Sequence, residues 1–155
     1  ALDHPERVAA VVMVSSGARL RVSPAIFQAA EAALGGAPMP LDFAFGPGTD
    51  PAVVRAYGEA LAQTPADTAL ADWRACHGFD VRERLGGLSV PLLIVHGTDD
   101  ALTPPKFQEW LEQATGARRV ALDGVGHMLP WEAPQALGDA VRSWVDEQRL
   151  GGGRQ

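Results

Sequence analysis

Apolar residues form two short continuous runs along the chain, followed by a third run that is weaker. The runs cover Val8–Val14 and Pro91–Val95, and the weaker one covers Arg119–Leu122. Continuous hydrophobicity, in place of strict alternation, indicates strands that are buried on both faces, as in a parallel sheet. The pattern therefore predicts an α/β protein with three parallel strands.

Helical patterns follow each of the last two strands. Pro104 stands at the start of one pattern and Pro134 at the start of the other, where a helix tolerates the missing proline N–H. Each pattern carries an apolar stripe at helical spacing: Phe107, Trp110, Leu111 and Ala114 in the first, and Leu137, Val141, Trp144 and Val145 in the second. The alternation of strands and helices predicts βαβ units, whose strands all end at one edge of the sheet.

The segment between the first two strands has a different character and is too long for a simple crossover. Proline opens three expected helices in it, at Ser23-Pro24, Asp50-Pro51 and Thr64-Pro65. We therefore assign residues 1–19 and 81–149 to a sheet core, and residues 20–80 to a helical insertion that sits on the sheet. Residues 150–155 are rich in glycine and are expected to form a disordered tail.

Composition and charge narrow the function classes. A hydrophobic share of 46% and a charged share of 21% are typical of a folded soluble protein. The net charge of −6 argues against a nucleic-acid partner, because phosphate contacts need clustered lysine and arginine. The apolar runs are far too short to span a membrane. A single cysteine, Cys76, excludes an intrachain disulfide and fits a reducing compartment, so we expect a cytoplasmic protein.

Two of the strands run into glycine turns that carry candidate chemistry. The second strand leads into Gly97–Asp100, and the third leads into Gly124–His127. A carboxylate on one rigid turn can hold a histidine on the next in one tautomer and stabilise its imidazolium. We choose Asp100 as that carboxylate, because its spacing from the strand end turns the second of the two acids inward, and His127 as a general base. The competing interpretation of Asp100 is an N-cap of the helix that follows.

A nucleophile that would complete such a relay is missing from the sequence. Ser15 and Ser16 follow the first strand, but they lack the flanking glycines of a Gly-x-Ser-x-Gly elbow, and no such motif occurs elsewhere. Hydroxyl groups at the end of a strand commonly bond only to the backbone. Cys76 lies in the insertion without an implied partner histidine, so we interpret it as a small packed side chain.

Together these segments resemble the α/β-hydrolase fold family, of the serine hydrolase or esterase type. Residues 91–104 look like the family's strand-plus-acid segment, and Gly126-His127 looks like its histidine loop. Residues 1–17 resemble the piece that follows its nucleophile helix, and the insertion resembles its cap domain. The resemblance implies that the elbow serine stands upstream of Ala1, so the chain corresponds to a C-terminal portion with a partial α/β-hydrolase fold.

The resemblance also implies a function for the intact protein. A Ser-His-Asp triad would hydrolyse a carboxylic ester, or a similar acyl bond, of a small-molecule substrate, and Asp100 would orient His127 in it. Five side chains are expected to line the substrate pocket: Trp73, Phe43, Phe45, Leu102 and Met128. No metal or organic cofactor is implied, and the chain alone is expected to be inactive. Enol-lactone hydrolysis, haloalkane dehalogenation and cofactor-free haloperoxidation stay open as related chemistries of the fold.

The first strand suggests an alternative of a different class. In the whole family fold it would be an interior strand, so in this chain one of its apolar edges is open. An open edge favours pairing with a second copy or with a complementary N-terminal half. The alternative is therefore a non-catalytic module that associates through this edge. Because one side of the core would also be missing, folding of the chain alone should be marginal.

Overall fold

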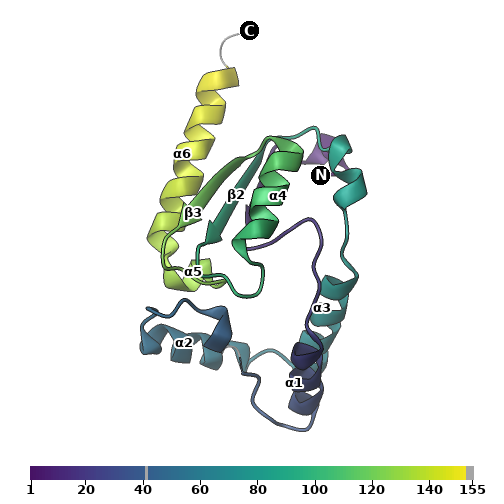
Figure 1. Ribbon diagram of the computed structural model, residues 1–155, viewed down its shortest axis with the longest axis vertical. Coiled ribbons are helices and arrows are strands. Elements are labelled where there is room, and N and C mark those ends of the chain that lie inside the picture. The colour runs from purple at the N-terminus through teal and green to yellow at the C-terminus, as the bar shows by residue number, and fades with distance from the viewer. Residues whose placement is uncertain (41, 153–155) are drawn as a thin grey trace.

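A computed structural model of the protein describes residues 1–40 and 42–152. Three strands, β1 (Val11–Val14), β2 (Leu92–Gly97) and β3 (Arg118–Leu122), form one sheet in the order β1-β2-β3 (Figure 1). Both pairings are parallel. The predicted α/β fold with three parallel strands is therefore confirmed, and the carboxyl ends of the strands all point to the same edge.

The strands differ in how deeply they are buried. All six residues of β2 are buried, whereas β1 and β3 are only partly covered. In the register, Leu93 of β2 lies opposite Val12 on one side and Arg118 on the other. β1 is also shorter than the predicted run, because the Val8 amide donates to the Pro5 carbonyl of a short 3-10 turn, η1 (Pro5–Arg7), and not to the sheet.

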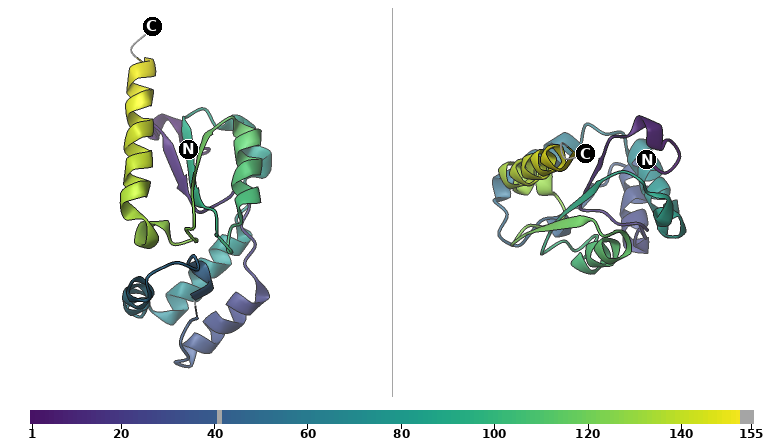
Figure 2. Two further views of the ribbon diagram at one scale, coloured as in Figure 1. Left: turned by 60° about the vertical axis from the view of Figure 1, so that its left-hand side comes forward. Right: turned by 90° about the horizontal axis from the view of Figure 1, so that it is seen from above.

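Helices cover both faces of the sheet. Helix α4 (Pro105–Thr115) lies on one face, and α5 (Leu129–Glu132) and α6 (Pro134–Gly152) lie on the other (Figure 2). Alternate residues of β2 point to opposite faces. Two apolar clusters result: Leu92, Ile94, Leu111 and Ala18 beneath α4, and Leu93, Val95, Leu129 and Trp144 beneath α6.

The C-terminal end differs from the expected tail at residues 150–155. Helix α6 continues through Gly152, and residues 153–155 lie outside the described residues. None of the helices in the described part of the chain is both long and apolar enough to cross a bilayer.

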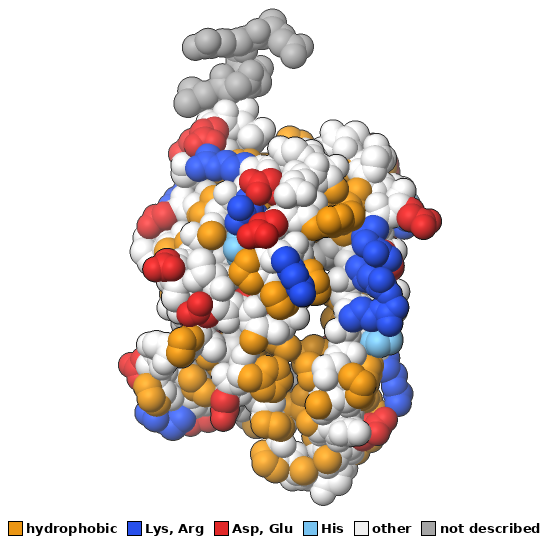
Figure 3. Space-filling view, in the orientation of Figure 1, with side chains coloured by type: hydrophobic (Ala, Val, Ile, Leu, Met, Phe, Trp, Pro, Cys, Tyr) orange, Lys and Arg blue, Asp and Glu red, His pale blue; other side chains and the backbone are white. Residues whose placement is uncertain are grey.

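Residues 20–80, called the helical region from here on, lie at the carboxyl edge of the strands (Figure 1). They form α1 (Pro24–Leu34), α2 (Pro51–Leu61) and α3 (Ala66–Gly78), with a short 3-10 turn, η2 (Asp42–Ala44), between α1 and α2. The predicted proline starts are present in all three helices, and the side chains of Ser23 and Asp50 cap the first two. Apolar side chains are plentiful on the surface of this part of the molecule (Figure 3).

The chain enters and leaves the helical region at one place. Arg19 and Asp80 form an isolated antiparallel bridge. The Leu20 amide donates to the Phe79 carbonyl at 3.1 Å, and the Val81 amide donates to the Ala18 carbonyl at 2.8 Å. After this junction a 3-10 segment, η3 (Arg82–Gly87), leads the chain to β2. The two connections between the helical region and the sheet are thus paired with each other through their backbones.

Candidate active site

The acid loop, residues 97–104, follows the central strand and is held by the Asp100 carboxylate. Asp100 Oδ1 accepts hydrogen bonds from the amides of Leu102 and Thr103, at 2.9 and 2.8 Å. Asp100 Oδ2 accepts a third bond from the Thr103 hydroxyl, at 2.8 Å. The carboxylate is buried, with 3% of the residue exposed, whereas the neighbouring Asp99 is exposed. Asp100 therefore points inward and Asp99 outward.

His127 lies against the same carboxylate. Its Nδ1 is 2.9 Å from Asp100 Oδ2 and 3.1 Å from Oδ1. Because a carboxylate only accepts hydrogen bonds, this contact favours the tautomer that carries its proton on Nδ1. The other ring nitrogen, Nε2, is then free to accept a proton. The arrangement has the geometry of a general base with its orienting acid.

Electrostatics keep the acid ionised. Burial by itself raises the pKa of Asp100, but the hydrogen bonds from His127 and Thr103 outweigh burial, and the net pKa lies below its usual value. The carboxylate is therefore charged at neutral pH, and it can stabilise a positive charge that develops on the imidazole.

The histidine loop, residues 123–128, is positioned by distant backbone. The His127 amide donates to the Ala44 carbonyl at 2.7 Å, and the Asp99 amide donates to the Val125 carbonyl at 2.9 Å. A side chain on Gly97 would collide with the Val125 and Gly126 carbonyls. Glycine at position 97 is therefore required by the close approach of the two loops.

Glu132, on α5, ties the histidine loop to the helical region. Its Oε2 accepts bonds from the Gly46 amide at 2.8 Å, the Thr49 hydroxyl at 2.7 Å and the Gly126 amide at 2.9 Å. Its Oε1 accepts a bond from the Met128 amide at 3.0 Å. Glu132 was not among the predicted site residues, and its one signal in the sequence is an acid five positions after a histidine that follows a glycine.

Two further sets of contacts hold the elements around the site in place. Gln108, fully buried on α4, donates from Nε2 to the Ser16 carbonyl at 2.6 Å and to the Thr103 carbonyl at 3.1 Å. The Tyr57 ring packs edge-on between Phe45 and Trp131, with centroid distances of 5.5 Å to each. Gln108 fixes the acid loop to the end of β1, and the aromatic stack fixes α2 to α5.

A cavity of about 250 Å³ opens beside His127 and is mostly apolar. It is lined by Val14, Ser15, Ser16, Leu20, Arg21, Val22, Trp73, Cys76, Leu102, Thr103, Phe107 and His127. A larger cavity of about 640 Å³ lies among the helices of the helical region, but neither Asp100 nor His127 lines it. We take the smaller cavity as the candidate substrate site because the base lines it.

The five side chains expected to line the pocket are distributed unequally. Trp73 and Leu102 line the cavity that His127 lines. Phe43 is exposed, and Phe45 is buried against Tyr57. Met128 is half-buried, and its amide binds Glu132. The structure therefore brings two of the five together with His127, and neither phenylalanine nor Met128 is among the residues that line this cavity.

Ser15, at the end of β1, has an unusual environment. Its φ of 42° lies in the left-handed region, where a residue with a side chain is strained. Its hydroxyl is buried and has no hydrogen-bond partner among the described residues. The expectation that a strand-end hydroxyl bonds to the backbone is therefore wrong for Ser15, whose side chain lines the cavity with an unused hydrogen-bonding group.

Two other histidines make contacts away from the Asp100–His127 pair. His96 is buried, donates from Nδ1 to the Gly97 carbonyl and accepts from Arg119 at Nε2, both at 3.0 Å. His77 packs edge-on against Phe27. Within residues 1–40 and 42–152, no group of three His, Cys, Asp or Glu side chains has an arrangement that could hold a metal ion.

Comparisons with known proteins agree with this architecture. A proline iminopeptidase from Lactobacillus crispatus is 30% identical over 71 residues, which cover 46% of this chain and 24% of that protein. The 3-oxoadipate enol-lactonase 1 from Acinetobacter baylyi is 31% identical over 77 residues, which cover 50% of this chain and 29% of that protein. A solved structure of a thermophilic esterase is 25% identical, with a TM-score of 0.76, covering 94% of this chain and 59% of that one.

The chain thus matches less than a third of the length of these two curated relatives, and about three fifths of the esterase. A family model extends the match over most of the present sequence, from residue 1 to residue 140, and its description is the alpha/beta hydrolase family. On this match, and on the parallel sheet with an acid and a histidine at its carboxyl edge, the chain belongs to the alpha/beta hydrolase family.

Proposed function

We propose that this chain supplies the acid and the base of a Ser-His-Asp triad that hydrolyses a carboxylic ester or a similar acyl bond. The observation that carries the proposal is the contact between Asp100 and His127 Nδ1, at 2.9 Å, beside a cavity that His127 lines. The nucleophilic serine would come from outside the 155 residues, since they contain no Gly-x-Ser-x-Gly motif.

In the proposed reaction His127 Nε2 takes the proton of the serine hydroxyl as its oxygen attacks the ester carbonyl carbon. Asp100 holds the imidazole in the required tautomer and stabilises the imidazolium that forms. His127 then returns the proton to the departing alcohol, and an acyl-enzyme remains. In the second half His127 deprotonates a water molecule, which releases the carboxylic acid and restores the serine.

The substrate class is inferred from the cavity and from the relatives. Leu102, Trp73 and Phe107 give the cavity apolar walls, which suit the acyl or alcohol part of a small ester. The similar proteins include an esterase, an enol-lactonase and a proline iminopeptidase. All three names fit attack on an acyl carbon, so we place esters and lactones first and leave amide substrates as a variation. We also propose that residues 20–80 act as the cap over this site.

The test is complementation. The purified chain is assayed with p-nitrophenyl butyrate, alone and mixed with the N-terminal part of a related α/β-hydrolase that carries an elbow serine. We expect no hydrolysis and no labelling by a fluorophosphonate from the chain alone, and both on mixing. His127→Ala should abolish the hydrolysis, and Asp100→Asn should lower it by about 10⁴-fold. His4→Ala, at an exposed histidine, is the matched control.

Serine-dependent hydrolysis by the chain alone, or hydrolysis on mixing that survives His127→Ala, would contradict the proposal.

A second candidate function, a non-catalytic module, rests on the open edge of β1. Val12 is 37% exposed, although it lies in the middle of an apolar strand, and β1 pairs on one side only within the described residues. A second copy or a complementary half could add a strand there. Sedimentation of the chain over a concentration series tests this idea. Association that Val12→Lys abolishes would favour the module, and a monomer at all concentrations would count against self-pairing.

A further inference from the structure

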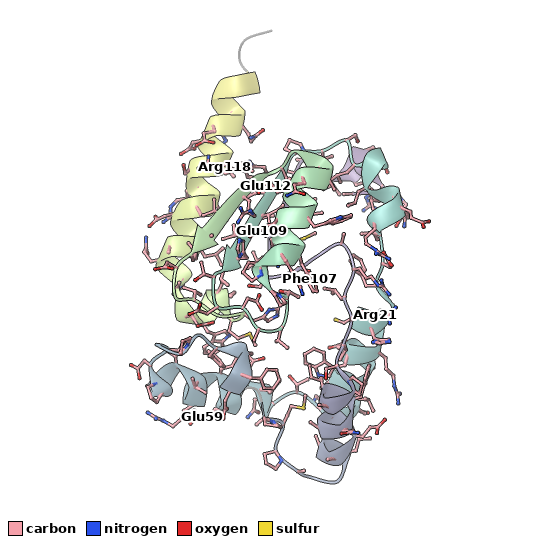
Figure 4. The ribbon with its side chains drawn as sticks, viewed as in Figure 1. Arg21, Glu59, Phe107, Glu109, Glu112 and Arg118 are labelled. Carbon is pink, nitrogen blue, oxygen red and sulfur yellow. The ribbon has the colours of Figure 1, made fainter. Side chains whose placement is uncertain are left out.

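Arg21 is a cation at the candidate substrate cavity that has no bonded partner. It lies on the exposed connection between β1 and α1 (Figure 4), and it is among the residues that line the cavity beside His127. No hydrogen bond or ion pair joins its guanidinium to any of the described residues. Ser15, which lines the same cavity, has a buried hydroxyl that is likewise unused. The cavity therefore offers a ligand the Arg21 guanidinium beside walls that are mostly apolar.

Asp80, an acid on which the charge of Arg21 acts, is already engaged by other arginines. Asp80 accepts two hydrogen bonds from Arg82, at 2.9 and 2.7 Å, and Arg19 Nε lies 3.5 Å from it. The pKa of Asp80 is lowered chiefly by the Arg82 hydrogen bond, and the charge of Arg21 contributes least. Three arginines thus act on the Asp80 carboxylate. It binds Arg82 and Arg19, but it does not bind Arg21.

A second cavity, of about 280 Å³, adjoins the first through Arg21 and Phe107, which line both. Its other walls are Ala18, Arg19, Arg82 and Trp110. The ammonium group of Lys106 lies 5.7 Å from the Phe107 ring centroid, and Glu83 is the further acid close enough to act on Arg82. Basic side chains gather on the flank where the helical region joins the sheet (Figure 3). This flank is cationic, although the chain carries a net charge of −6.

We infer that the substrate is an ester or lactone that also bears a carboxylate, which Arg21 binds while the acyl group lies beside His127. A guanidinium presents two parallel N–H donors to a carboxylate, and Phe107 and Leu102 are apolar walls of the cavity that Arg21 and His127 share, which suits the apolar part between the two groups. The inference rests on the proposed function for the reacting end of the substrate. Recognition of the anionic end is a binding event that can be measured without any hydrolysis.

The test compares an acid with its neutral isostere. The ¹⁵N-labelled full chain is titrated at low salt with 3-phenylpropanoate and with 3-phenylpropanamide, and the indole N–H signals of Trp73 and Trp110 report binding. We expect the carboxylate to bind about tenfold more tightly than the amide, because a hydrogen bond to a charged group is worth about that factor. Arg21→Gln should remove this preference, and Arg21→Lys should retain part of it through its charge.

Arg55→Gln is the matched control, since Arg55 is an exposed arginine on α2 without an ion pair among the described residues. It should leave the preference unchanged. Equal binding of acid and amide to the unaltered chain overturns the inference, and so does a preference that persists in Arg21→Gln. The complementation assay uses p-nitrophenyl butyrate, a neutral ester. A loss of acid preference with intact complementation therefore removes only the inference, and the reverse result removes only the proposed triad.

Discussion

The two loops that bring Asp100 and His127 together are held in opposite ways. Within the acid loop, the Asp100 carboxylate accepts hydrogen bonds from groups two and three residues further along, at Leu102 and Thr103. The amides of the histidine loop bond instead to groups outside the loop. Its amides reach Ala44 in the helical region and Glu132 on α5, and Glu132 binds Gly46, 86 residues away in sequence.

This difference assigns different roles to the two halves of the site. A loop that satisfies its own polar groups keeps its shape as long as its strand is in place, so the acid is mounted on the core. The histidine is mounted between the core and the helical region. A change in the helical region should therefore reach His127 through Gly46 and Glu132, while leaving Asp100 where it is.

The largest expected effect comes from the contact that the two loops share. Gly97→Ala places a methyl group against the Val125 and Gly126 carbonyls, which are backbone and cannot move aside. We expect a loss of about 4 kcal/mol in the free energy of unfolding, measured by urea denaturation. Gly86→Ala is the control, because nothing lies near its added methyl group, and it should change stability by less than about 0.5 kcal/mol.

An unchanged urea midpoint in Gly97→Ala would contradict the close contact between the acid loop and the histidine loop.

Removal of the acid should have the next largest effect. Asp100→Ala leaves the buried Thr103 amide and hydroxyl, and the partly buried Leu102 amide, without their acceptor. Each unsatisfied buried donor costs about 1–3 kcal/mol, and the loop can recover part of this by relaxing, so we expect a loss of about 3 kcal/mol. Asp99→Ala, at the exposed neighbour, should be within about 0.5 kcal/mol of the original chain. Similar losses in both variants would contradict the inward placement of Asp100.

The self-contained nature of the acid loop explains why the sequence predicts it well. The apolar run before Gly97, the two acids and Pro104 lie within a few residues of one another, so strand, turn and helix start can be inferred from local pattern. The meeting of this loop with the histidine loop follows from parallel strands that end at one edge. The catalytic roles of Asp100 and His127 stay predictions until they are assayed.

The histidine loop shows what local pattern cannot give. Glu132 has no distinctive sequence surroundings. Its role depends on hydrogen bonds from Gly46 and Thr49, which the fold brings beside it. The placement of Phe45 has the same origin: its apolar side chain suggests a pocket wall, but it packs against Tyr57.

A smaller effect is expected at Glu132, which joins the histidine loop to the helical region. Glu132→Gln keeps the size of the side chain but replaces one acceptor oxygen by an NH₂ group, which faces donors whichever way it is turned. We expect a loss of about 1–2 kcal/mol, since the site is only partly buried. Amide hydrogen exchange should accelerate at Gly46 and Gly126 and stay unchanged at Thr103. Glu59→Gln, on the exposed side of α2 (Figure 4), is the control.

Faster exchange at Thr103 as well as at Gly126 would show that the two loops respond as one unit. It would contradict the independent mounting of Asp100 and His127.

The smallest expected effect is a change in how stability depends on pH, and it tests the charge of Asp100. Burial opposes the hydrogen bonds from His127 and Thr103, so the net lowering of the Asp100 pKa is a difference between opposing influences. A carboxylate with a lowered pKa stabilises the folded state above its unfolded pKa of about 3.9, and this stability is lost as the pH falls through the lower folded pKa. Urea midpoints measured from pH 7 down to pH 3 should therefore fall less steeply in Asp100→Asn than in the original chain. An equal slope would mean that folding leaves the pKa of Asp100 unchanged, which would contradict the lowered value.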